Sequence, residues 1–433
     1  MRKKSVLALL LALVMILSGC ALVTKDQAKD DARVIIDVNG ETVTKGVIST
    51  AVQNQISQNE YFNQMLTSYY GYSVYPTDEA TVTSQIIEAY TEELVLKQKA
   101  LAQGFDQMTE EEQAEVDKQA QEYYDSFLQS VISSYLPNSG LEGDELTAAA
   151  EKCVAENDVK TADGRSTLAD FQKTALENKA VDKLKADIVK DVAVTEEEIK
   201  ADFDAKVETA KAAMEEDPNQ YGYNVSNGAA VYYAPAGYRM VKHILIEVSE
   251  EDEQAATDAQ TALSAAQDAL ANAAEDADKA ALQAAVDEAQ AAYDAAQAAG
   301  MANAKAKAEE VYAKAAAEGA DFDALITEYN DGTGMPANGY AIREGYTYFV
   351  EPFVTAAMAL QNVGDVSEPV ESTYGYHVIK YVSDVAEGPV DMETVRESIS
   401  SALLETKKDE LTETTIHQWV EEANVKTYLD RLK

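Results

Sequence analysis

The sequence predicts an α+β protein that is mostly helical and carries one small antiparallel sheet with helices. Over most of the first half, apolar residues recur at the spacing of about 3.6 residues that an amphipathic helix requires. Two short alternating segments, each with a histidine, lie far apart in the second half, and an alanine-rich stretch separates them. The 433 residues suffice for more than one domain.

The N-terminus predicts an export signal that ends in a lipidation motif. The basic start "RKK" precedes an apolar run, residues 6–17, that is too short to cross a bilayer as a helix. The motif "LSGC" matches the bacterial lipobox, which implies cleavage before Cys20 and a diacylglyceryl group on its sulfur. We expect a lipoprotein signal peptide over 1–19 and a lipidated tether over 20–32. An ordinary signal peptide with a chance cysteine is the alternative.

Charge and cysteine content exclude several function classes. The chain has 77 acidic and 35 basic residues, so nucleic acid and bare anionic lipid headgroups are not expected partners, since phosphate binding needs Lys and Arg patches. Apart from Cys20, the sequence contains one cysteine, Cys153, which we expect to be a buried apolar residue in a helix. The three histidines are far apart in sequence, so we predict no metal site and no cofactor.

The folded part is predicted to begin with a hairpin and to continue as helices. Val34, Ile36 and Val38 alternate, and Asn39-Gly40 forms a two-residue turn before the chain returns. Helical patterns then cover residues 81–105, 108–137, 166–194 and 194–214, and Thr195 with Glu198 forms a capping box at the last of these. Tyrosines cluster near residues 70, 123, 222 and 232, which favours either a peptide-binding surface or loop packing.

The second half combines alternating strands with an unusual alanine-rich segment. The strand "YRMVKHILIEV" places Ile244 and Ile246 on one face and His243 and Leu245 on the other. Residues 251–300 contain 22 alanines and no proline, which predicts two helices of about 20 residues in an antiparallel hairpin. A single continuous rod is the alternative. After Gly300 we expect an ordinary amphipathic helix, a short helix, the strand "STYGYHVIKYV", a long final helix and a short strand.

The motifs between residues 238 and 385 resemble one known family. "VKHILI", "FDALITEY", "PFVTAAMAL", "VGDVSEPVES" and "YGYHVIK" occur in the order and spacing of the parvulin-type peptidyl-prolyl isomerase domain, once the alanine-rich segment is set aside as an insertion. The flanks, including "VNGETVTKGVI" and "WVEEANVKTYLD", are similar to foldases of the SurA/PrsA class.

The resemblance implies a domain order. We expect a helical SurA/PrsA-like chaperone domain over 33–236 with an inserted parvulin domain over 237–386. The alanine-rich hairpin would occupy 251–302 of that insertion. Residues 387–433 would form a C-terminal helix and strand that pack on the chaperone domain, with His417 and Trp419 against its helices.

The resemblance also implies the site residues. Two facing histidines and nearby polar groups would form the floor of the isomerase site, and an apolar slot would hold the proline ring. The expected catalytic residues are His243, His377, Asp331, Ser372 and Thr373, and the expected substrate-binding residues are Phe349, Phe353 and Ala341. The chain departs from the family pattern at Gly332, where a polar residue is usual, and across 338–342. An active isomerase and a weak or inactive one both remain open.

These features together predict a membrane-anchored extracytoplasmic foldase. Its expected partners are unfolded or partly folded exported proteins with X-Pro bonds, and the membrane through the N-terminal lipid. The alternatives are a holdase chaperone with a weak or inactive parvulin domain, and a surface scaffold that docks partners through the alanine-rich hairpin. The sequence leaves the oligomeric state and the preferred residue before proline open.

Overall fold

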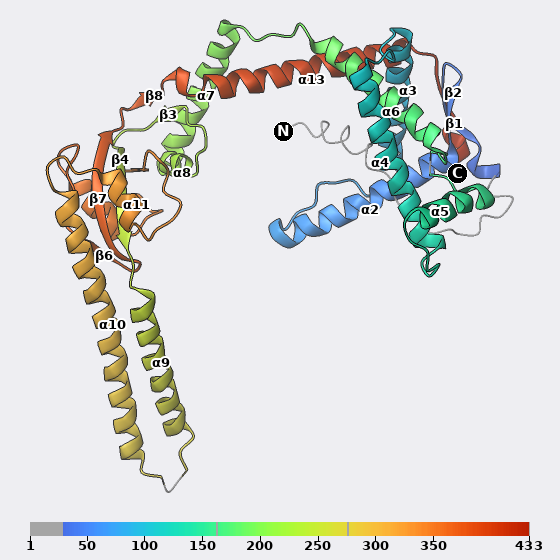
Figure 1. Ribbon diagram of the computed structural model, residues 1–433. Helices are drawn as coiled ribbons and strands as arrows, with labels where there is room; N and C mark the ends of the chain where they lie inside the picture. Colours follow the sequence, from blue (N-terminus) through green and yellow to red (C-terminus); the bar gives the residue numbers. More distant parts are fainter. Residues whose placement is uncertain (1–28, 162, 275–276, 433) are drawn as a thin grey trace. The chain divides into compact units, whose positions relative to one another are not determined.

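The computed structural model describes residues 29–161, 163–274 and 277–432, and the predicted lipidation site at Cys20 lies outside them (Figure 1). The contacts divide the described chain into two compact units. One contains the residues up to 193 and those from 404, and the other contains 194–403. The long helix α13 (Arg396–Glu422) begins in the second unit and ends in the first. Within the described residues, no helix is long and apolar enough to span a membrane.

A three-stranded sheet joins the two ends of the described chain in the first unit. β1 (Val34–Val38) pairs antiparallel with β2 (Glu41–Thr44) on one side and with β9 (Val425–Thr427) on the other. Asn39 and Gly40 both have positive φ, 54° and 96°, as this kind of two-residue turn requires. The predicted hairpin is confirmed, and the C-terminal strand closes beside it.

Helices build the rest of the first unit. They enclose buried clusters around Ile48 and Val82, around Phe171 and Phe127, and around Leu184. Cys153 is buried in the second cluster, as expected. The helices are α2 (Lys45–Tyr70), α3 (Glu79–Ala102), α4 (Glu110–Tyr135), α5 (Gly143–Asn157) and α6 (Leu168–Val189).

The final helix meets the N-terminal core through one of the two residues expected to do so. Trp419 packs against the clusters around Ile48 and Leu184, so its predicted packing is confirmed. The expectation for His417 was wrong. Its side chain is 72% exposed and lies 3.5 Å from the carboxylate of Glu421, one helical turn later. The helix can turn only one face to the core, and His417 lies outside that face.

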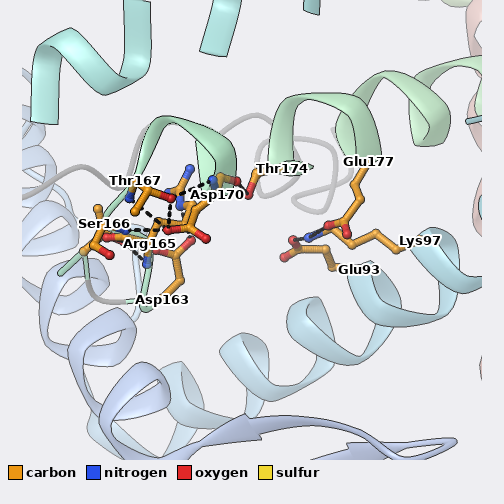
Figure 2. A network of polar contacts seen from close by, with 10 residues as sticks. Glu93, Lys97, Asp163, Arg165, Ser166, Thr167, Asp170, Thr174 and Glu177 are labelled. Carbon is orange, nitrogen blue, oxygen red and sulfur yellow. Dashed lines mark hydrogen bonds and ion pairs between the residues drawn. The ribbon is translucent and has the colours of Figure 1, made fainter. Parts of the chain in front are cut away.

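Polar contacts tie α3 and α6 together (Figure 2). Lys97 on α3 lies 2.7 Å from Glu93 and 3.6 Å from Glu177 of α6, and all three side chains are largely shielded from water. At the start of α6, the Asp170 carboxylate accepts hydrogen bonds from the backbone N–H groups of Ser166 and Thr167. These contacts satisfy N–H groups that a helix start would otherwise leave unpaired.

A four-stranded antiparallel sheet lies at the centre of the second unit. Its order is β5-β4-β7-β6, formed by β5 (Tyr340–Ile342), β4 (Arg239–Ile246), β7 (Gly375–Asp384) and β6 (Val370–Ser372). A short antiparallel pair is formed by β3 (Tyr233–Ala234), which precedes the sheet in the chain, and β8 (Gly388–Pro389), which follows it. The helices α7 (Glu196–Glu216) and α8 (Gln220–Ser226) precede the sheet, and the predicted capping box at Thr195 is present.

Different helices pack on the two faces of the sheet. Ile244 pairs with Val378 on the face that α10 (Lys279–Ala315) and α11 (Phe322–Tyr329) cover. His243 pairs with Ile379, and Leu245 with His377, on the opposite face, where α12 (Glu351–Ala359) packs. This alternation, which the sequence predicted, places both histidines on the same side. The α+β class is confirmed.

The alanine-rich segment forms the predicted hairpin, but its second helix is longer than expected. α9 (Glu250–Ala271) and α10 (Lys279–Ala315) lie side by side (Figure 1). The expectation of a separate helix after Gly300 was wrong, because α10 continues through this residue. A Cβ at Gly300 would lie 2.9 Å from Cγ1 of Val248 and 3.2 Å from Cβ of Asp252. The glycine therefore allows α10 to cross the root of α9 closely.

Candidate active site

Adjacent strands bring the two histidines of the sheet into direct contact. Because His243 pairs with Ile379 and His377 with Leu245, the two histidines are diagonal neighbours on the same face. Their Nδ1 atoms are 3.1 Å apart, and their ring centroids 5.2 Å. One imidazole therefore donates an N–H to the other, and the structure contains the histidine pair that the family resemblance implied.

The turn between β6 and β7 supplies a hydroxyl to this pair. Gly375 has φ of 122°, and a Cβ there would lie 2.2 Å from the carbonyl oxygen of Ile246, so the turn needs glycine. Ser372 pairs with Gly375, and its Oγ lies 2.8 Å from Nε2 of His377. The N–H of Tyr374 donates to the same Oγ. Thr373 lies in the turn itself and is exposed, and no described contact joins it to a histidine.

Burial keeps both histidines neutral. Burial, together with the smaller effect of the neighbouring His377, lowers the pKa of His243 from 6.5 to about 3. Burial also lowers the pKa of His377, to about 4. At neutral pH the hydrogen-bonded series of His243, His377 and Ser372 therefore carries no charge. Neutral imidazoles can donate and accept hydrogen bonds without bringing an ion into an apolar site.

An aromatic side chain closes the site over the histidines. Phe353 is 2% exposed, and its ring stands edge-on to His243 at 5.2 Å and to His377 at 5.3 Å. It lies in the first turn of α12, directly after Pro352, which is favoured at a helix start. Phe349, four residues earlier, lies 5.3 Å from Phe353 and is half-buried. The two predicted slot residues are therefore adjacent.

Tyr340, which the sequence did not single out, packs against the same rings. Its ring lies 4.7 Å from Phe349 and 5.8 Å from His243. The register pairs Tyr340 with Val241, on the face of the histidines, and pairs Ala341 with Met240, the alternate position. Ala341 is buried in the same core as Phe353, but Tyr340 is the residue whose side chain contacts the histidine. Only the strand register could distinguish the two positions.

Arg239 holds the helix that carries Phe353. Its Nη1 donates to the carbonyl oxygens of Leu360 at 2.8 Å and Ala357 at 3.2 Å, at the C-terminal end of α12. The guanidinium also lies 4.2 Å from the ring centroid of Tyr381. A cation is favourable where helix carbonyls lack partners. The sequence signal for this contact is an arginine at the start of an apolar strand.

The residues after α11 serve the backbone of β4. Asp331 is exposed, its N–H donates to the carbonyl of Leu245, and its carboxylate accepts from the N–H of Glu247. Asn330 accepts from the N–H of Leu245 at 2.7 Å. No described contact brings Asp331 to the histidines. A Cβ at Gly332 would meet Leu245 only at 3.5 Å, an ordinary contact distance, so this position has room for a side chain.

Comparison with known proteins identifies the domain that contains these residues. Residues 291–383 match the family described as the PPIC-type PPIASE, or rotamase, domain. The chain carries a parvulin-type isomerase domain. The match includes Phe353 and His377, whereas His243 precedes it in sequence. Within the described residues, no group of three or more His, Cys, Asp or Glu side chains could hold a metal ion.

The relatives extend the similarity to the flanks. The foldase protein PrsA of Clostridium tetani is 34% identical over 111 residues, which are 25% of this chain and 32% of the relative. The foldase protein PrsA of Clostridium acetobutylicum is 22% identical over 417 residues, 94% of this chain and 91% of the relative. The first alignment thus spans about a third of its relative. These similarities confirm the predicted resemblance to parvulin-type foldases.

The comparison with solved structures also finds a match. A SurA-like chaperone of Campylobacter jejuni is 16% identical, and its alignment covers 70% of this chain and 95% of that protein with a TM-score of 0.24.

Proposed function

We propose that this protein is an extracytoplasmic foldase that isomerises X-Pro bonds in unfolded exported proteins and holds such chains while they fold. The observation that carries the enzymatic part is the neutral His243–His377 pair beneath the buried ring of Phe353. This arrangement combines polar, uncharged imidazoles with an apolar ring. The parvulin-type match supports the same reaction.

The site geometry suits a reaction that makes and breaks no covalent bond. The barrier to rotation is the loss of amide resonance, about 18–20 kcal/mol, and the uncatalysed exchange takes tens to hundreds of seconds. The resonance form separates charge and is stabilised by water. An apolar slot formed by Phe349, Phe353 and Tyr340 would remove that water, and the twisted amide would be favoured relative to the planar one. The neutral imidazoles would offer hydrogen bonds without fixing a charge.

The isomerase assay tests this proposal directly. Purified protein should accelerate cis/trans exchange in a proline peptide, measured by magnetisation-exchange NMR, and His377→Ala and Phe353→Ala should slow it. His417→Ala is a matched control, because His417 is exposed and distant in sequence from the sheet. Exchange at the rate of buffer alone would refute the enzymatic part.

A holdase activity is the second candidate, and exposed aromatic side chains favour it. The end of α2 and the following loop carry large side chains with little cover, and Tyr69 is 78% exposed. Amphipathic rings of this kind bind varied unfolded segments at low entropic cost. The exposed side chains are Tyr61, Met65, Tyr69, Tyr70, Tyr72, Val74 and Tyr75.

The holdase proposal predicts a separable activity. The protein should suppress aggregation of a denatured client, measured by light scattering, and this should survive replacement of both His243 and His377 by alanine. Replacing Tyr69, Tyr70 and Tyr72 together by serine should weaken it. Suppression that disappears with the histidines would argue against a separate holding surface.

Membrane attachment through Cys20 is part of the proposal. The sequence "LSGC" supports it, and a fatty-acid label that is retained by wild-type protein and lost from Cys20→Ser would test it. A scaffold role for the hairpin of α9 and α10 is a further alternative. Removing the same number of residues from α9 and α10 at the tip of the hairpin should then change the pulled-down partners or the oligomeric mass. Unchanged partners and mass would exclude the scaffold role.

A further inference from the structure

A helix outside the matched domain packs closely on the edge of the isomerase sheet. In α8, a Cβ at Gly222 would lie 2.5 Å from the carbonyl oxygen of Ala341 and 2.8 Å from the ring of Tyr346. Glycine therefore lets α8 lie directly on β5. The preceding residue, Tyr221, is buried with its ring 4.8 Å from that of Tyr238. These contacts anchor α8 beside the slot and leave Tyr223 facing outward.

Tyr223 and Tyr348 form an exposed pair of rings, which we call the aromatic shelf. Their centroids are 5.1 Å apart, and the two residues are 48% and 54% exposed. Tyr346 is buried beside them, with its ring 5.6 Å from Tyr348. The shelf therefore has a fixed support, although its own two rings face water.

A series of packed rings links the shelf to the residues of the proposed proline slot. Tyr346 lies 5.6 Å from Phe349, and Phe349 lies 5.3 Å from Phe353. An extended peptide advances about 3.3 Å per residue, so a segment whose proline occupies the slot could place a side chain within about six residues on the shelf. Rings that are rigid, amphipathic and already paired bind another apolar group with a small loss of entropy.

We propose that the aromatic shelf is a second subsite for the same client segment and binds an aromatic or large aliphatic side chain near the proline. This inference rests on the proposed slot for proline. It assigns α8 a role in substrate selection, because α8 carries Tyr223. This helix lies outside the matched residues 291–383. The client chain is the expected occupant because packed rings connect the shelf to the residues that would hold its proline.

Peptide binding to the full protein tests the shelf independently of catalysis. Fluorescein-labelled proline peptides would carry one phenylalanine, stepped from one to six residues on either side of proline, or glycine throughout. For at least one phenylalanine position, Tyr223→Ala and Tyr348→Ala should each raise Kd by about two- to tenfold, measured by anisotropy. The glycine peptide should bind all variants equally, and Tyr223→Phe should retain most of the preference.

The controls separate this inference from the isomerase proposal. Tyr135→Ala removes another exposed tyrosine, from α4 in the other unit and outside the proposed holding surface, and should leave every Kd unchanged. Equal effects of Tyr223→Ala on phenylalanine and glycine peptides, or no effect on either, would overturn the shelf as a subsite. If the variants distinguish the phenylalanine peptides from the glycine peptide but wild type does not accelerate exchange, the isomerase activity is refuted and the shelf stands. If wild type accelerates exchange but the variants do not distinguish the peptides, the shelf is refuted and the isomerase activity stands.

Discussion

His243 and His377 meet Nδ1 to Nδ1 at 3.1 Å although 134 residues separate them in the chain. The neighbouring Phe353 and Tyr340 present rings to the pair and no charged group. A pair held in this way is neutral over a wide pH range, and its hydrogen bonds orient the rings. The charge of the pair, the orientation of its rings and the polar groups around it can therefore be tested separately.

The isomerase rate is expected to be insensitive to pH around the usual titration of histidine. Because the pKa values of His243 and His377 are lowered to about 3 and about 4, the neutral pair persists well below 6.5. The exchange rate should stay level from pH 8 to about 5 and decrease only toward 4. Exchange measured by NMR across this range checks it, and a decrease centred near 6.5 would contradict it.

The same shifts should make folding depend on pH. The unfolded chain binds protons at these histidines below about 6.5, whereas the folded chain does so only near 4 or lower, so the free energy of unfolding decreases as the pH falls between these values. At pH 5 the loss is about 2 kcal/mol per histidine. Urea denaturation of wild type and His377→Gln at pH 7 and 5 measures it. The variant should show a smaller decrease, and equal decreases would exclude the effect.

Removing the serine hydroxyl should slow exchange by loosening His377. Ser372 provides the partner of Nε2 at 2.8 Å, so Ser372→Ala leaves a buried ring nitrogen without it. We expect the rate to fall about two- to tenfold with little change in peptide Kd. Thr373→Ala is the matched control, since Thr373 is exposed in the same turn. A similar fall in both variants would indicate a turn defect instead.

Arg239 is expected to stabilise the slot through α12. Arg239→Met keeps an apolar stem against Tyr381 but loses the hydrogen bonds to the carbonyls of Ala357 and Leu360. The free energy of unfolding should fall by about 1–3 kcal/mol, measured by urea denaturation. The free energy of unfolding of Arg239→Lys should lie between those of wild type and Arg239→Met, because lysine keeps the charge but lacks the planar guanidinium group. Unchanged stability in both variants would show that these hydrogen bonds contribute little.

A side chain at Gly332 should strengthen the floor of the site. The new Cβ would lie 3.5 Å from Leu245 and from Oδ1 of Asn330, and Leu245 pairs with His377 across the strands, so Gly332→Ser adds a hydroxyl beside the partner of His377 without a clash. We expect exchange to accelerate about two- to fivefold. Gly332→Ala controls for the added Cβ and should leave the rate unchanged. An equal acceleration by alanine would assign the gain to rigidity.

The amount that could be predicted differs from element to element. The turn at Asn39-Gly40, the capping box at Thr195 and the alternation of β4 depend on neighbouring residues, and the structure contains all three. The resemblance also implied the two histidines, Phe349, Phe353 and Ser372 that the structure brings together. The continuity of α10 through Gly300 was missed, because glycine disfavours helices locally while close packing on Val248 requires it.

The sequence by itself determined the first hairpin, the two strands that carry the histidines, most of the helices and the residues from which an isomerase site could be built. Tertiary structure alone decided which of them share a surface. Strand register places Tyr340 rather than Ala341 beside His243, Arg239 reaches the end of α12, and α8 brings Tyr223 to Tyr348. The physical reason is that local patterns depend on spacings of two to four residues, whereas these contacts join segments whose separation only the packed sheet and its helices define.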